Sequence, residues 1–205
     1  MMEQLFSVFG NVKIGKNVFI EPFCLIGYAE ETQNNSESAI TIIGNNVEIH
    51  SHSVISQNCI LGNNVWCGNY TYIGENTKIA DGVELMYGAK VYNNVSIGKN
   101  SWIGGFICNN AIIEEDCVVM GTLIHKFTNA IIGIPEPFPT IRKGAFIGMN
   151  AIVIGGVEVG ENAYIAAGSV LTKSAKPNML YLGNPARCIG KAPLPFNKEK
   201  NERKE

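Results

Sequence analysis

Three histidines are the side chains best suited to move a proton in the neutral pH range. His50 and His52 stand two residues apart, and His125 stands alone much further along the chain. A zinc site built on histidines needs three of them at one point, and this spacing does not favour it. We therefore expect no metal, and we take His125 as a candidate general base.

Glu84 is a second candidate base, because its spacing from two tryptophans is regular. Trp66, Glu84 and Trp102 are each 18 residues apart. If the chain repeats with that period, the carboxyl group lies between two indoles, which would raise its pKa toward a useful range. A subunit interface with Glu84 paired across it explains the same three residues equally well.

Other residues could bind a substrate rather than react with it. Asn109 and Asn110 are adjacent amides that could orient a sugar. Lys173, Lys176 and Arg187 could hold phosphate groups near the C-terminus, although a solvated basic end explains them too. The chain has no Gly-rich phosphate loop and no strand-linked GxGxxG motif, so the sequence does not support nucleotide hydrolysis or dinucleotide redox chemistry.

The composition is that of a globular protein with a small net charge and no strong electrostatic field. The 205 residues are 46% hydrophobic and 17% charged, with a formal net charge of -2. This balance does not favour binding to nucleic acid or to an anionic membrane, and no apolar run reaches the roughly 18 residues that a bilayer needs. We expect a cytoplasmic protein with no nucleic-acid or membrane partner.

A six-residue repeat supplies the elements that must position these groups. Aliphatic residues recur every six positions and give 24 hexads, with anchors in the runs 8–26, 43–103, 107–119 and 141–171. Of the 24 anchors, 23 are Ile, Leu or Val, and the other is Cys67. This period fits neither an amphipathic helix nor a long alternating strand.

A second column of residues supports the same repeat. The residue four positions after each anchor is small in 21 of the 24 hexads, and the exceptions are Glu30, Ile107 and Leu123. Three of the six cysteines fall in this column, where a free thiol acts as a compact apolar side chain. We therefore expect interior thiols rather than a disulfide framework.

Three hexads of 18 residues can close one triangular coil whose short strands stack in parallel on the coil below. Eight such coils, at about 4.8 Å for each stacked strand, make a prism roughly 35 to 40 Å long. The sequence predicts this all-β solenoid over 1–175, followed by a C-terminal extension or tail over 176–205.

Two insertions and a register slip interrupt the repeat. The insertions span 28–41 and 121–140, and the slip lies between the anchors at 103 and 107. The second insertion carries His125 and a cluster of prolines, which favour a stiff arm. A long loop within a regular fold is usually functional or disordered, whereas the first insertion is typical of a solvated loop.

The pattern of anchor, glycine and small residue resembles the hexapeptide-repeat transferases. The stretch 183–187, Gly-Asn-Pro-Ala-Arg, and the run 127–129, Phe-Thr-Asn, are similar to the branch that moves acyl groups from acyl-CoA to amino sugars on nucleotide carriers. The resemblance implies a left-handed parallel β-helix, a homotrimer with sites between subunits, coenzyme A as the acyl carrier, and a nucleotide-linked amino-deoxysugar, with dTDP expected, as acceptor.

The same resemblance suggests roles for individual residues. The place of His125 resembles that of the catalytic histidine in sugar and xenobiotic O-acetyltransferases. The amides that the amino-sugar branch carries at 104–106 are replaced by Gly-Gly-Phe, and Asn109 and Asn110 follow three residues later. Small residues of the last coils would leave backbone amides open to the pantetheine arm, namely Gly148, Ala166, Ala167 and Gly168.

Several alternatives remain open. Transfer to a hydroxyl group of a sugar or xenobiotic would make His125 indispensable, whereas transfer to an amine could use Glu84 or leave the proton to the departing thiolate. A zinc carbonic anhydrase would need converging histidines. A non-enzymatic solenoid would leave the His125 loop unexplained. We also expect Trp66, Trp102 and Phe106 to form an outward apolar stripe that a trimer would cover.

Overall fold

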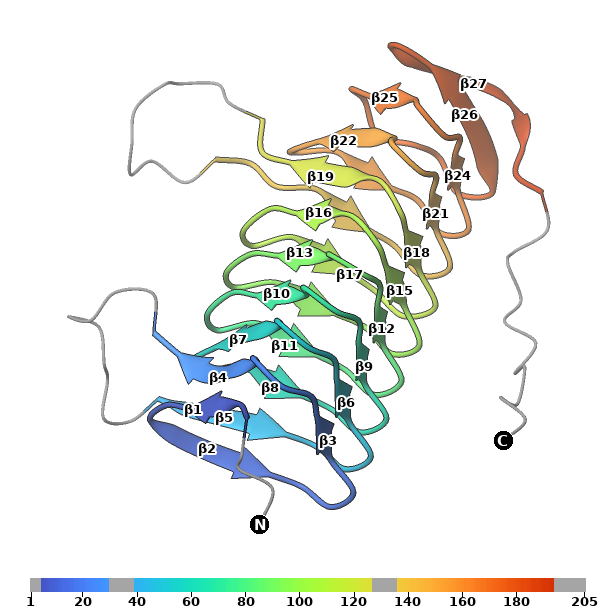
Figure 1. Cartoon of the computed structure of the whole chain (residues 1–205). Coiled ribbons are helices and arrows are strands. Elements are labelled where there is room, and N and C mark those ends of the chain that lie inside the picture. The colour runs from blue at the N-terminus through green and yellow to red at the C-terminus, as the bar shows by residue number, and fades with distance from the viewer. Residues whose placement is uncertain (1–4, 30–38, 127–135, 194–205) are drawn as a thin grey trace.

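The structure is a computed structural model that describes residues 5–29, 39–126 and 136–193. Within these ranges the chain forms 27 strands and no α-helix, and hence no helix long and apolar enough to cross a membrane. Figure 1 shows the strands stacked as a three-sided prism, with the N-terminal and C-terminal coils at opposite ends. The predicted all-β solenoid is confirmed.

Each face of the prism is one sheet, and successive strands of the chain pass from sheet A to sheet B to sheet C. Sheet A contains β1 (Ser7–Val8), β4 (Leu25–Tyr28), β7 (Val54–Ser56), β10 (Tyr72–Ile73), β13 (Lys90–Val91), β16 (Phe106–Ile107), β19 (Thr122–Ile124), β22 (Ile152–Ile154) and β25 (Val170–Leu171). Sheet B contains β2 (Asn11–Ile14), β5 (Ile40–Ile43), β8 (Ile60–Leu61), β11 (Lys78–Ile79), β14 (Ser96–Ile97), β17 (Ile112–Ile113), β20 (Thr140–Ile141) and β23 (Glu158–Val159).

Sheet C completes the triangle and closes the C-terminal end of the stack. It contains β3 (Phe19–Ile20), β6 (Glu48–Ile49), β9 (Trp66–Cys67), β12 (Glu84–Leu85), β15 (Trp102–Ile103), β18 (Val118–Val119), β21 (Phe146–Ile147), β24 (Tyr164–Ile165), β26 (Met179–Gly183) and β27 (Ala186–Lys191). The β26 strand continues the parallel stack on β24, and β27 turns back antiparallel to it. The stack therefore extends past residue 175, and the predicted tail lies outside the described residues from 194 onward.

The anchors of the hexads fill the interior of the prism. Every predicted anchor from Ile26 onward is at most 2% exposed, whereas Val8 and Ile14 of the first coil are more than 40% exposed because no coil covers them from below. The cysteines are free thiols, and all except Cys188 are buried. The prediction of interior thiols is confirmed for those five.

One anchor was missing from the predicted repeat. Leu123 is fully buried and pairs with Ile107, which in turn pairs with Val91. Two successive coils are therefore 16 residues long rather than 18. The exceptions at 107 and 123 in the small-residue column arise because these residues are themselves anchors.

Both insertions leave the prism at the same corner, which we call the A–B corner. The first joins β4 to β5 and the second joins β19 to β20, so each connects a strand of sheet A to a strand of sheet B. The regular strands extend into both ends of the predicted insertions. The corner between sheets C and A, the C–A corner, is reached from β21 and β24.

Polar side chains at the corners tie neighbouring coils together. The side-chain oxygen of Asn63 accepts a hydrogen bond from the backbone N–H of Asn45 at 2.9 Å, and Asp81 accepts one from the N–H of Asn63 at 2.8 Å. In each pair an oxygen on one coil satisfies the N–H of the coil before it. These ladders supply hydrogen-bond acceptors for backbone N–H groups of exposed and half-buried turns.

Candidate active site

A polar ladder at the A–B corner leads directly to His125. Gln57 donates to the Glu75 carboxylate at 3.1 Å, the Glu75 N–H donates to Asn93 Oδ1 at 2.9 Å, and the Asn93 N–H donates to Asn109 Oδ1 at 2.9 Å. Each of these residues lies two positions after an anchor. Because Leu123 pairs with Ile107, His125 occupies the next rung of the ladder, one coil above Asn109.

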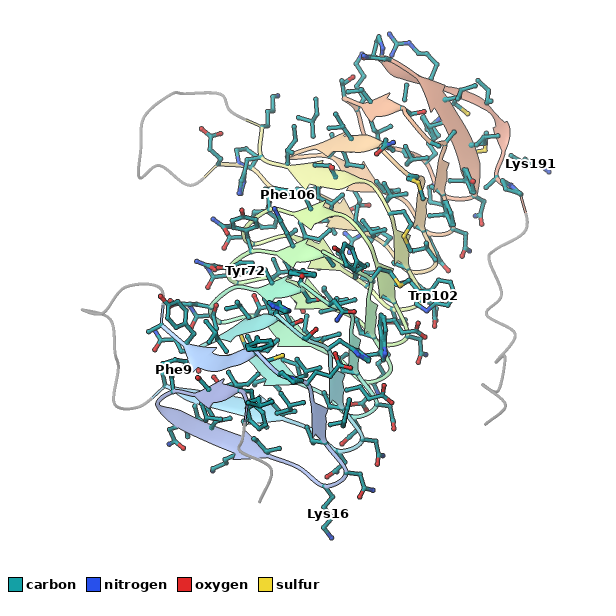
Figure 2. The ribbon with its side chains drawn as sticks, viewed as in Figure 1. Phe9, Lys16, Tyr72, Trp102, Phe106 and Lys191 are labelled. Atoms are coloured by element: carbon teal, nitrogen blue, oxygen red, sulfur yellow. The ribbon has the colours of Figure 1, made fainter. Side chains whose placement is uncertain are left out.

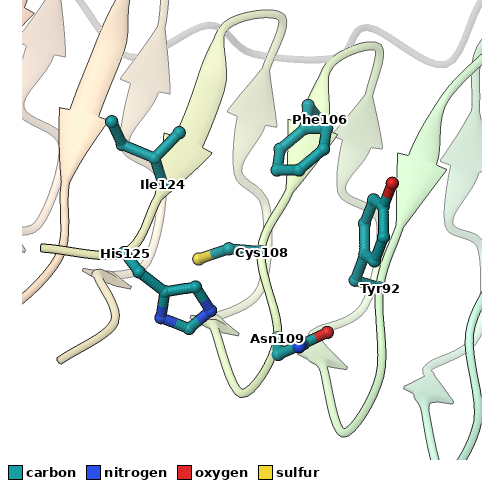
Figure 3. Close-up of a pocket in the computed structure, with 6 residues that line it drawn as sticks. All are labelled: Tyr92, Phe106, Cys108, Asn109, Ile124 and His125. Atoms are coloured by element: carbon teal, nitrogen blue, oxygen red, sulfur yellow. The ribbon is translucent and has the colours of Figure 1, made fainter. Parts of the chain in front are cut away.

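His125 and Asn109 line one pocket of about 220 Å³ together with Tyr92, Phe106, Cys108 and Ile124 (Figure 3). The wall is almost entirely apolar. Tyr92 and Phe106 contact each other with ring centroids 4.8 Å apart. Burial raises the pKa of the Cys108 thiol to about 12, so this sulfur is a neutral part of the wall rather than a nucleophile.

The second insertion is narrow where it leaves the prism. The Lys126 N–H donates to the Pro137 carbonyl at 3.1 Å, which closes the base of the insertion beside His125. Gly155 lies against this neck, and a Cβ atom built on it would overlap the backbones of Pro137 and Lys126. The run 127–129, on which part of the family resemblance depends, lies outside the described residues.

Charges on either side of the insertion hold its two ends in register. Arg142 pairs with Glu114 at 2.8 Å and also with Glu158, and Lys143 pairs with Glu115 at 3.1 Å. The hydrogen bond from Arg142 lowers the pKa of the Glu114 carboxyl group, and the hydrogen bond to Glu158 raises the pKa of Arg142. This clamp joins the coil before the insertion to the two coils after it.

Glu84 lies on a different face from the pocket. The predicted column is confirmed, because Glu84 pairs in register with both Trp66 and Trp102 on sheet C, and all three are half-buried. Phe106 belongs to sheet A, and Figure 2 shows it on a different side of the prism from Trp102. The expectation of one stripe containing Phe106 was wrong, because the register slip moves residue 106 to the next face.

Asn110 has a structural explanation in its turn. Its φ of +65° is the left-handed corner conformation that asparagine tolerates, and its N–H donates to the Asn93 carbonyl at 3.0 Å. Of the two predicted amides, only Asn109 lines the pocket.

The residues expected to contact the pantetheine arm lie at the C–A corner, at the other end of the sheet A strands from His125. The N–H groups of Gly148, Ala166 and Gly168 donate to the carbonyls of Ile165, Tyr181 and Met149 within the stack. The expectation that these three amides are open was therefore wrong, because a parallel coil uses them to bind its neighbours. Ala167 lies beside them on the same corner.

Lys173, Lys176 and Arg187 are exposed at the C-terminal end of the prism. Lys173 lies at the A–B corner, Lys176 lies between sheets B and C, and Arg187 lies on β27. The three share one end of the stack without sharing one face.

The other two histidines make contacts within the first coils. His50 Nδ1 lies 3.1 Å from a Glu21 carboxylate oxygen, and His52 stacks on Tyr70 with ring centroids 4.9 Å apart. Within the described residues, no group of three or more His, Cys, Asp or Glu side chains could hold a metal ion.

Comparison with known proteins identifies the repeat. The family model "bacterial transferase hexapeptide (six repeats)" matches residues 138–173. The chain is 38% identical over 114 residues to a putative serine acetyltransferase of Schizosaccharomyces pombe, which covers 54% of this chain and 42% of that protein. It is 35% identical over 88 residues to serine acetyltransferase of Salmonella typhimurium, covering 43% of this chain and 32% of that protein. The chain thus spans less than half of the length of these relatives.

A solved structure extends the likeness over nearly the whole chain. The UDP-N-acetylglucosamine acyltransferase of Campylobacter jejuni aligns with a TM-score of 0.59 at 18% identity, covering 92% of this chain and 74% of that one. The predicted fold, a left-handed parallel β-helix, is thereby confirmed. The comparisons thus show a hexapeptide repeat over residues 138–173 and the fold of the whole prism.

Proposed function

We propose that the chain transfers an acyl group from acyl-CoA to a sugar-type acceptor, with His125 as the general base. The observation that carries the proposal is the position of His125 in an apolar pocket, one coil above Asn109. Within the described residues, this pocket is lined by a titratable side chain, His125, that lies where the second insertion leaves the prism. The similarity to acetyltransferases supports acyl transfer as the reaction.

The chemistry needs few groups. An acceptor hydroxyl or amine attacks the thioester carbon while His125 takes its proton, the C–S bond then breaks, and the protonated His125 returns the proton to the thiolate of coenzyme A. Much of the remaining rate comes from holding the acceptor and the thioester together. No metal is required for any step.

A hydroxyl acceptor is the one that this geometry favours. A hydroxyl group keeps its proton until it attacks the thioester. Acyl transfer to a hydroxyl group therefore depends on a base at the position of His125. The amino group of a nucleotide-linked amino-deoxysugar is the second candidate, and the similarity of residues 183–187 to that branch supports it. Such an acceptor could use the departing thiolate as the base instead.

A thiol-release assay separates these acceptors. Acetyl-CoA and longer acyl-CoAs should be offered with hydroxyl sugars, with UDP-N-acetylglucosamine and with dTDP-4-amino-4,6-dideoxyglucose. Release that depends on a sugar acceptor supports the proposal, and the acylated product identifies oxygen or nitrogen as the acceptor atom. If no sugar acceptor in this panel accelerates thiol release, the proposal is wrong.

We expect a homotrimer in which each site lies between two subunits. His125 and the donor-side residue Ala167 occupy opposite corners of sheet A in one chain, so one site can use both only if neighbouring subunits contribute them. Light scattering should give the trimer mass at micromolar concentration. Mixed trimers of His125→Asn and Ala167→Trp chains should recover activity that neither variant has alone; a monomer, or a mixture without recovery, contradicts the arrangement.

The basic end of the prism is expected to hold the phosphates of coenzyme A. Replacing Lys173, Lys176 and Arg187 with alanine should raise the KM for acyl-CoA several-fold and leave the acceptor KM nearly unchanged, because contacts to the donor's phosphates contribute to the binding of acyl-CoA and not to that of the acceptor. Steady-state kinetics at low and high salt should show a smaller difference at high salt. Equal binding of coenzyme A and dephospho-coenzyme A would contradict a contact to the 3′-phosphate.

A further inference from the structure

We propose that the side-chain amide of Asn109 binds the carbonyl oxygen of the acyl thioester and stabilises the negative charge that this oxygen gains during transfer. The inference rests on the proposed function and deepens it, because it assigns Asn109 to the acyl donor rather than to the sugar.

The ladder fixes which way the Asn109 amide points. Only the side-chain oxygen can accept the hydrogen bond from the Asn93 N–H, at 2.9 Å. The Nδ2 group is therefore turned away from that contact, and within the described part of the chain it has no hydrogen-bond partner. Asn109 also lines the pocket (Figure 3). Two N–H donors are thus available to a ligand there.

The spacing between Asn109 and His125 suits one reacting carbon. They occupy adjacent rungs of the A–B corner, and stacked coils are about 4.8 Å apart. A tetrahedral carbon between them carries the attacking atom on one side and the former carbonyl oxygen on another. A donor for such an oxygen works at about 2.7–3.1 Å, so a base and a donor on neighbouring rungs can serve the two atoms together.

The pocket strengthens such a hydrogen bond. Its wall consists mainly of the side chains of Tyr92, Phe106, Cys108 and Ile124. Because this wall offers few competing dipoles, a fixed N–H donor interacts more strongly with a developing charge there than it does in water. A sugar with several hydroxyl groups would find too few partners in this wall, because each buried unpaired hydroxyl costs free energy.

The step balances as follows. The acceptor oxygen or nitrogen bonds to the thioester carbon as its proton passes to His125, and the π electron pair of the carbonyl moves onto the oxygen held by Asn109. When the C=O bond re-forms, the C–S bond breaks and its electron pair leaves with the sulfur. The thiolate then takes the proton from His125. Asn109 gives up no proton at any stage.

Asn93 offers a matched control for this role. Its side-chain oxygen accepts the Glu75 N–H at 2.9 Å, the same ladder contact one coil earlier, and it is half-buried like Asn109. Asn93 does not line the pocket. Damage to the ladder should therefore affect both residues alike, whereas contact with the acyl group should affect only Asn109.

The experiment compares Asn109→Asp with Asn93→Asp, since aspartate keeps the accepting oxygen and loses the N–H donors. We expect Asn109→Asp to lower kcat by about 10²- to 10³-fold with little change in the acceptor KM. We expect Asn93→Asp to keep nearly the wild-type kcat and a similar melting temperature. The alanine pair, Asn109→Ala and Asn93→Ala, removes the added charge and should give the same contrast.

Three results would overturn the inference: equal losses of kcat at both positions, a raised acceptor KM for Asn109→Asp at unchanged kcat, or no effect at either. The first assigns Asn109 to the ladder, and the second assigns it to the sugar. A wild-type chain that releases no thiol with any acceptor instead overturns the proposed function, and the two failures are therefore distinguishable.

Discussion

Replacing His125 with asparagine is expected to lower kcat for acyl transfer by about 10²- to 10⁴-fold, the usual worth of a general base. The substitution should fold, because Asn93 and Asn109 occupy the two preceding rungs of the same ladder. The measurement is kcat against pH with the acceptor identified by thiol release. The acyl-CoA KM should change little, since an imidazole that acts mainly on the transition state adds little to ground-state binding.

Two variants serve as controls for that result. His52→Asn alters an exposed histidine whose φ of +63° suits asparagine, and it should keep the wild-type kcat. Glu84→Gln alters the other candidate base, which lies on sheet C away from the pocket, and it should keep most of the activity. If His125→Asn and Glu84→Gln both retain more than about a tenth of the rate, no base of that size acts and the leaving thiolate collects the proton.

The hexad period predicted the architecture because burial imposes one strong rule on every coil. Each anchor must fill the prism interior, so Ile, Leu and Val recur at the spacing of the coils. This spacing predicts the coils without any knowledge of their contacts. The 18-residue spacing also predicted correctly that Glu84 lies between Trp66 and Trp102 on one face. Where coils are regular, periodicity alone places side chains on faces.

The same rule explains where the prediction failed. The sequence showed the slip at 103–107 but not the second one at 119–123, so Leu123 was missed as an anchor. Phe106 precedes the anchor at 107, and grouping it with Trp102 overlooked that the first slip moves it to the next face. Accepting Leu123 as an anchor would have placed His125 directly above Asn109. That signal was present in the sequence, since position 123 was one of three exceptions in the small-residue column.

Other parts of the site depend on geometry that a period does not contain. The spacing does not reveal that the N–H groups of Gly148, Ala166 and Gly168 are used within the stack. The direction of the Asn109 amide also follows from one hydrogen bond to the neighbouring coil. The placement of the donor side against His125 depends on how neighbouring subunits meet, which requires contacts between chains.

Replacing Gly155 with alanine is expected to lower kcat by about 10²-fold or more, because a displacement of about 1 Å in a reacting group costs that much. The new methyl group would overlap the backbones of Pro137 and Lys126 at the neck of the insertion. A rigid backbone cannot move aside as the end of a side chain can, so the neck itself must shift. Because His125 is adjacent to Lys126 in the neck, His125 would shift with it. Overpacking of this kind also costs about 1–3 kcal/mol of stability.

Gly62→Ala separates the displacement of His125 from the loss of stability. Its Cβ atom would also meet the backbone of the next coil, at Ala80 and Asp81, on the corner between sheets B and C. Both variants should lower the melting temperature by similar amounts, as measured by circular dichroism, but only Gly155→Ala should lower the kcat of the folded protein. Equal kcat values for the two variants would mean that the neck does not position His125 and that the insertion acts independently of the coil beneath it.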